Sequence, residues 1–143
     1  MSIDDLANTQ WTGKAELWLD PLGNDAIVCD CTLQIEHGTI RTTWSYEGKP
    51  QHGVLTLRSG GADFTDTFHS PTPMACVCAP NPWGLIDVLG TYAAGDGPRW
   101  GWRITVALRP DSDELVLQMA NIKPWGEEGR AVRMVGRRSQ RMS

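Results

Sequence analysis

Residues 100–122, WGWRITVALRPDSDELVLQMANI, contain two segments in which apolar and polar side chains alternate. The even-numbered residues between positions 100 and 108 are apolar, and so are the odd-numbered residues between positions 115 and 119. Alternation with a period of two puts the apolar side chains of a strand on a single face. Residues 110–113, PDSD, lie between the two segments and are typical of a tight turn. This stretch therefore predicts an antiparallel hairpin with one apolar face.

The same pattern extends over most of the 143-residue chain, which contains 15 Gly and 9 Pro. Turn residues separate aromatic and β-branched runs at a spacing of about 8–12 residues, which is typical of an all-β domain. Closing up-and-down strands into a barrel removes the exposed sheet edges. We therefore predict one domain, residues 1–143, that forms a ten-stranded antiparallel up-and-down β-barrel; a two-sheet sandwich is the alternative. Strands are expected over residues 11–19, 26–36, 39–46, 53–58, 62–69, 74–79, 84–93, 100–108, 114–122 and 131–138.

The first ten residues are the one segment with helical character. Ser2 and Asp5 have the spacing of a capping box, and Ile3 and Leu6 would share one helical face. We expect a short N-terminal helix here.

The charge balance excludes several classes of partner. The chain has 13 Lys and Arg against 17 Asp and Glu, a net charge of −4. It therefore lacks the basic field that binds nucleic acid or an anionic membrane. No apolar run approaches the roughly 20 residues of a membrane span, and the first residues, MSIDDL, lack the features of a signal peptide. We expect a cytoplasmic protein that carries no cofactor.

Several short motifs in the second half of the chain carry a resemblance to a known family. They are ADFTDTFH at 62–69, PMAC at 73–76, LGTY at 89–92, GWRI at 101–104 and LQMANIKPWG at 117–126, before a last strand that ends in Arg137 and Arg138. In this order they resemble an uncharacterised bacterial family, domain of unknown function 1579, whose members are small lipocalin-like (calycin) barrels. The resemblance implies a fold and no chemistry, so no catalytic residue is transferred from it.

Two Cys-x-Cys motifs, at residues 29–31 and 76–78, are the candidates for disulfide or metal chemistry. On a strand the two sulfurs of such a motif lie roughly 7 Å apart. Tetrahedral zinc needs sulfurs about 2.3 Å from the metal, which is closer than this spacing allows. The cysteines also lie where apolar residues fit, and free cysteine is among the most buried residue types. Reduced core thiols are therefore favoured over a disulfide between the two strands or a metal site.

Of the three histidines, His69 is the candidate for function, since His37 and His52 lie beside turn glycines. His69 ends an expected strand three residues after Asp66, and strand parity puts the two on opposite faces unless a bulge intervenes. His69 is interpreted as a hydrogen-bonding residue at the barrel rim, with a ligand contact or a catalytic role as alternatives. No nucleophile elbow, phosphate loop or dinucleotide motif occurs. The absence of a histidine after position 69 argues against a haem-binding barrel.

Asp87 is the one acidic residue within its expected strand, and it shares parity with Leu85 and Leu89. An inward-facing carboxylate would need a cationic partner, which Arg41 or Arg103 could supply. With Asp66 these residues would form a buried polar cluster, either as a structural ion pair or as an anchor for a ligand headgroup.

The apolar faces of residues 100–108 and 115–119 are expected to line an internal cavity of at least about 300 Å³. The favoured function is a carrier or sensor for a small apolar or amphipathic molecule. Alternatives are a small isomerase-like or hydrolase-like enzyme in the same cavity, and an interaction module that forms a homodimer through exposed tryptophans such as Trp18. The expected ligand-binding residues are Trp44, Phe64, Asp66, Phe68, His69, Trp100, Trp102, Arg103 and Met119, with no catalytic or metal-binding residue.

We also expect a contact between the first and last strands. Lipocalin-type barrels resemble one another in packing an arginine of the last strand on a tryptophan near the start of the first. Trp11 and Arg138 stand at these places. The match is partial, because the residues from Asn8 to Trp11 lack the glycine that usually lies two positions before the tryptophan. Parity independently turns both side chains inward. The alternative is that Arg138 belongs to a solvated basic tail, residues 137–141.

Overall fold

A computed structural model describes residues 1–20 and 22–139 of the chain. This part of the chain forms one short 3-10 helix and ten strands. Every strand pairs antiparallel with the next, and β1 also pairs with β10, so the sheet closes on itself. The elements are η1 (Ile3–Leu6), β1 (Thr9–Trp18), β2 (Ala26–Glu36), β3 (Thr39–Tyr46), β4 (Lys49–Arg58), β5 (Gly61–Asp66), β6 (Ser70–Cys78), β7 (Ile86–Tyr92), β8 (Trp100–Arg109), β9 (Glu114–Ile122) and β10 (Glu128–Arg138).

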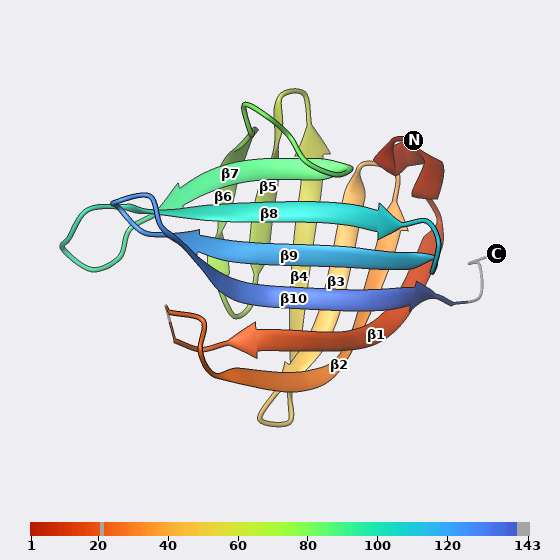
Figure 1. Cartoon of the computed structure of the whole chain (residues 1–143), viewed down its shortest axis with the longest axis horizontal. Coiled ribbons are helices and arrows are strands. Elements are labelled where there is room, and N and C mark those ends of the chain that lie inside the picture. Colours follow the sequence, from red (N-terminus) through yellow and green to blue (C-terminus); the bar gives the residue numbers. More distant parts are fainter. Residues whose placement is uncertain (21, 140–143) are drawn as a thin grey trace.

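The predicted all-β, up-and-down barrel is therefore confirmed, and the sandwich alternative is wrong. Figure 1 shows that the barrel is flattened: strands β7–β10 and β1 cross in front of strands β3–β6 at a steep angle. The short helix and the C-terminal end of β10 lie at the same side of the molecule (Figure 1). Side chains of the two crossing layers meet between them.

Several predicted boundaries were wrong: β4 begins at Lys49 rather than 53, β5 ends at Asp66 rather than 69, and β10 begins at Glu128 rather than 131. The helix covers only Ile3–Leu6 rather than ten residues, although the Ser2 main-chain N–H donates to the Asp5 carboxylate as a capping box requires. The break expected over residues 70–73 is part of β6, which contains Pro71 and Pro73. Among the described residues, β7 pairs only with Val77 and Cys78 of β6. The two prolines therefore face no partner strand on that side. Their lack of a main-chain N–H costs no ladder hydrogen bond there.

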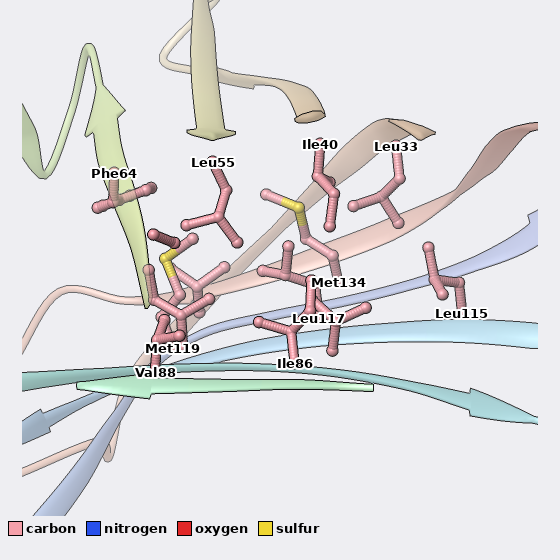
Figure 2. Close-up of a cluster of buried hydrophobic side chains, with 14 of the residues drawn as sticks. Leu33, Ile40, Leu55, Phe64, Ile86, Val88, Leu115, Leu117, Met119 and Met134 are labelled. Atoms are coloured by element: carbon pink, nitrogen blue, oxygen red, sulfur yellow. The ribbon is translucent and has the colours of Figure 1, made fainter. Parts of the chain in front are cut away.

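Apolar side chains fill most of the barrel interior. Leu33, Ile40, Leu55, Ile86, Val88, Leu115, Leu117 and Met134 come from strands of both layers and converge in Figure 2. The parity predicted for β8 and β9 is confirmed, because Ile104, Val106, Leu115 and Leu117 are all buried. The expectation that these faces line a cavity is wrong along most of their length. The two layers cross closely enough for their side chains to interdigitate at native density.

The contact predicted between the first and last strands is confirmed. Trp11 is fully buried and pairs in register with Arg138, whose guanidinium carbon lies 4.7 Å from the indole centroid. The Arg138 guanidinium also donates to the Asp113 carboxylate at 3.0 and 3.2 Å. Arg138 is therefore held between an aromatic face and a carboxylate instead of being free in a basic tail. Residues 140 and 141 of that tail lie outside the described residues.

Replacing Arg138 tests how much its contacts with Trp11 and Asp113 stabilise the folded protein. Arg138→Ala removes the cation–π contact and the ion pair together, so we expect the free energy of unfolding to fall by about 1–2 kcal/mol. Arg137→Ala is the matched control, because the neighbouring Arg137 side chain is 78% exposed. Thermal and urea unfolding of both variants measure the difference. Equal destabilisation by the two variants would show that the contact with Trp11 carries no weight.

All four cysteines have free thiols, but two of them do not lie in the core as predicted. Cys31 and Cys76 are buried core thiols, Cys29 is half-buried, and Cys78 is exposed at the end of β6. No disulfide joins the two motifs, since all four cysteines are free. Burial is the main cause that raises the pKa of the Cys31 thiol to about 12 and that of Cys76 to about 11.

These differences predict an order of thiol reactivity. Cys78 should react first with Ellman's reagent at about pH 8, because its thiol is exposed and accessible to the reagent. Cys31 and Cys76 should react only after denaturation. The Cys78→Ser variant should lose the fast phase while the slow thiols are unchanged. Rapid labelling of all four thiols in the native protein would contradict the buried positions.

Candidate functional site

A cavity of about 300 Å³ opens at the end of the barrel opposite η1. Strand β1 starts beside η1, and its last residue, Trp18, belongs to the cavity wall. The wall is built from residues at the ends of β1, β7 and β9 and from residues of β5, β6, β8 and β10 near the same end. It consists of Trp18, Leu19, Phe64, Phe68, His69, Ser70, Met74, Tyr92, Trp102, Asn121 and Ala131.

The polar centre of this wall is a pair formed by Asp66 and His69. Asp66 ends β5, and its side chain is 1% exposed. Its Oδ1 accepts the main-chain N–H groups of Phe68 at 2.9 Å, Ser70 at 3.3 Å and His69. Its Oδ2 lies 2.9 Å from Nδ1 of the His69 ring. The strand expected over residues 62–69 ends at Asp66, so His69 lies in the turn before β6, and the strand parity that would separate the two side chains does not apply to it.

Two glycines make room for this end of the interior. A Cβ on Gly53 would lie 2.6 Å from Thr42 Oγ1 and 3.2 Å from the Cβ of Asp66. Gly53 pairs with Asp66 across β4 and β5, so any larger residue would press on the carboxylate that holds the histidine. A Cβ on Gly90 would lie 2.4 Å from the Met74 sulfur, which belongs to the cavity wall.

The hydrogen bonds of Asp66 determine which nitrogen of His69 is free. A carboxylate that accepts three main-chain N–H groups acts as an acceptor, so Nδ1 carries the hydrogen that it shares with Oδ2. None of the described residues forms a hydrogen bond with Nε2. The ring is packed among Phe68, Trp102 and Trp44, at centroid distances of 4.8, 5.3 and 6.3 Å. His69 therefore presents a fixed imidazole with a free Nε2 at the cavity wall.

Aromatic rings form the rest of the site. Phe64 and Trp102 lie nearly parallel, 16° apart, with centroids 6.4 Å from each other. Tyr92 meets Trp102 edge to face, and its hydroxyl donates to the Asn121 side-chain oxygen. Burial raises the pKa of Tyr92, so this hydroxyl keeps its proton at neutral pH. Within the described part of the chain, the buried Nε1 of Trp102 and that of Trp44 have no hydrogen-bond partner.

Arg103 does not line this cavity. The predicted ion pair of Asp87 with Arg103 is confirmed, but its expected inward position and its grouping with Asp66 are wrong. Arg103 donates to the Asp87 carboxylate at 2.9 and 2.7 Å on the outer face of the barrel. Asp87 was expected to point inward because it shares parity with Leu85 and Leu89. The inward face of β7 is instead that of Ile86 and Val88. The loop before β7 covers the pair, and the Trp83 N–H donates to Asp87 at 2.9 Å.

The remaining predicted residues lie at different depths. Trp44 is buried behind His69, Met119 belongs to the packed core, and Trp100 contacts Trp125 outside the cavity, with centroids 6.3 Å apart. Arg41 pairs with Glu36 on the surface. Trp18 is 8% exposed beneath the Arg130 guanidinium, so the prediction of an exposed dimer-forming tryptophan is wrong at this residue.

The structure thus brings Phe64, Phe68, His69 and Trp102 together around one cavity, with Asp66 directly behind His69. Sequence reasoning missed the other wall residues, such as Tyr92 and Asn121. The predicted strand order could have identified them. In an up-and-down barrel the last residues of β1, β5, β7 and β9 all lie at the same end.

The outer pair yields a prediction about pH. Burial by itself would raise the pKa of Asp87, but the hydrogen bonds from Arg103 and the Trp83 N–H, with the Arg103 charge, outweigh it and lower that pKa. The resulting stabilisation is present above the carboxyl's ordinary pKa of about 4 and is lost as pH falls through the lowered one.

Asp87→Asn should therefore reduce the free energy of unfolding at pH 7 by about 2 kcal/mol. The gap between wild type and variant should narrow as pH falls below about 4. Urea unfolding of both proteins at several pH values from 7 to 3 measures this difference in the free energy of unfolding. Asp30→Asn, which alters the exposed pair of Asp30 with Lys14, is the control and should change stability little. A gap that stays constant with pH would contradict the assignment.

Comparison of the chain with family models, with curated proteins and with solved structures finds no match in any of the three. The resemblance to the lipocalin-like family of unknown function therefore stays a prediction. Across residues 1–20 and 22–139, no helix is long and apolar enough to cross a membrane. In the same residues, no three His, Cys, Asp or Glu side chains are grouped so that they could hold a metal ion. The described chain is an all-β barrel with one aromatic cavity at its open end.

Proposed function

We propose that this protein binds a small, mostly apolar molecule in the cavity around His69. The observation that carries the proposal is the wall itself, in which aromatic rings surround one imidazole that Asp66 holds in a fixed orientation. Ligand sites are commonly apolar concavities with a few placed polar groups. The volume of about 300 Å³ is at the lower end for such sites. It suits a compact ligand of up to about three aromatic rings rather than a long acyl chain.

Binding is favoured over the enzymatic alternative by the inventory of polar groups in the wall. An isomerase or hydrolase would need a second titratable or nucleophilic group ready to act with the histidine. The Tyr92 hydroxyl is engaged by Asn121, and the Ser70 hydroxyl donates to the Thr72 carbonyl at 2.6 Å. Both hydroxyls thus have internal partners, and the remaining polar groups of the wall besides His69 are indole N–H groups and the Asn121 amide, which support binding rather than proton transfer.

The proposal places this binding in the cytoplasm. Four free thiols are typical of a reducing compartment. The net charge of −4 is consistent with a ligand that is neither nucleic acid nor a membrane surface. The relation to the lipocalin-like family of unknown function is part of the same proposal and is supported by the barrel architecture alone.

Titration with N-phenyl-1-naphthylamine, whose fluorescence rises in apolar surroundings, tests the proposal. We expect saturable enhancement with wild type and its loss in Ala131→Phe, because the buried Ala131 lies in the cavity wall. Ala75→Phe is the matched control, since Ala75 is exposed on the outer face of β6. Thermal unfolding confirms that both variants are folded. Absence of enhancement in wild type, or full binding by folded Ala131→Phe, would overturn the proposal.

A further inference from the structure

We propose that the ligand of this cavity is a hydroxy-aromatic compound whose hydroxyl hydrogen-bonds to His69. The inference rests on the proposed function and specifies the chemical class of the ligand. It follows from which hydrogen-bonding groups of the wall are free, which are donors and which are acceptors.

The first free group is an acceptor. Asp66 Oδ2 lies 2.9 Å from His69 Nδ1, and Asp66 Oδ1 is occupied by main-chain N–H groups. With its hydrogen on Nδ1, a neutral imidazole has a lone pair on Nε2. Since His69 is in the cavity wall and no described residue bonds Nε2, the group that meets it must donate a hydrogen.

The second free group is a donor on the neighbouring ring. The Trp102 indole lies beside the imidazole, with ring centroids 5.3 Å apart, and its buried Nε1 has no partner among the described residues. A buried N–H without an acceptor is unfavourable, and an oxygen atom of a ligand would reach this one after a small rotation of the indole, because the N–H is shielded from the cavity as the ring stands. A hydroxyl both donates and accepts, and it is the simplest single group that suits an Nε2 acceptor beside an indole donor.

The surroundings favour a hydroxyl over a carboxylate and a ring over a chain. A carboxylate would meet the Nε2 lone pair, with the negative charge of Asp66 one hydrogen bond behind it. Phe64, Phe68 and Trp102 supply flat apolar surfaces in the wall, and such surfaces pack well against aromatic rings. The combination indicates a neutral phenol-type molecule.

The test uses two competitors that differ only in the hydrogen-bond donor, 1-naphthol and 1-methoxynaphthalene. Both displace bound N-phenyl-1-naphthylamine at about pH 7.5, and their inhibition constants are compared. We expect 1-naphthol to bind at least about fivefold more tightly, which is the usual contribution of one hydrogen bond. An equal affinity in wild type overturns the inference while leaving the proposed function intact. Failure of the fluorescent probe itself to bind overturns both.

A single substitution then identifies Asp66 as the source of the preference. In Asp66→Asn the side-chain oxygen can keep the main-chain bonds, but its NH₂ group donates to Nδ1 and moves the ring hydrogen to Nε2. Nε2 becomes a donor that the methoxy oxygen satisfies as well as the hydroxyl does. The ratio of the two inhibition constants should therefore fall to about one, whereas a merely weakened pocket would lower both affinities in proportion.

Asp63→Asn is the matched control, since Asp63 lies on the same strand with an exposed side chain that pairs with Arg58. It should keep the wild-type ratio. His69→Phe serves as the second variant, because it preserves a ring of similar shape and removes the acceptor. Circular dichroism verifies the fold of each variant. A wild-type ratio retained in folded Asp66→Asn or His69→Phe would overturn the role assigned to this pair.

Discussion

The pairing of β1 with β10 is the constraint on which the rest of the barrel depends. It removes the two edges that an open sheet of these strands would expose, and it joins residues more than a hundred positions apart in sequence. Trp11 and Arg138 lie in register at this seam, where the cation covers a fully buried indole and Asp113 completes the arrangement. The N-terminal 3-10 helix and the C-terminal end of β10 lie at this side of the molecule (Figure 1).

Closure at this end determines where space remains. The two crossing layers of strands bring side chains such as Leu33, Leu117 and Met134 into contact, so the middle of the barrel is packed (Figure 2). Several aromatic rings gather towards the opposite end, and glycines at positions 53 and 90 leave room for Asp66 and Met74. The cavity is therefore a local feature of one end rather than a hollow that runs through the barrel.

The chemistry of that end depends on one short turn. Asp66 accepts three main-chain N–H groups of the residues that follow it, and these bonds shape the turn between β5 and β6. The same carboxylate orients His69, so the local fold and the presentation of the imidazole have a common cause. The binding site that we propose would need no additional charged group in the cavity wall, and its selectivity would depend on hydrogen-bond direction more than on charge.

Alternation of apolar residues was enough to predict the strands, the inward faces of β8 and β9, and the up-and-down order, because the two-residue period of a strand is local. The pairing of Trp11 with Arg138 was expected from the resemblance to lipocalin-type barrels, and the parity of the two strands was consistent with it. The positions of His69, Arg103 and Asp87 could not be derived in this way. The expected strand ended at Asp66, so His69 lies in a turn where parity does not apply, and the inward face of β7 proved to be that of Ile86 and Val88. Which strands cross closely enough to exclude a cavity depends on contacts between distant segments, and only the tertiary structure determines them.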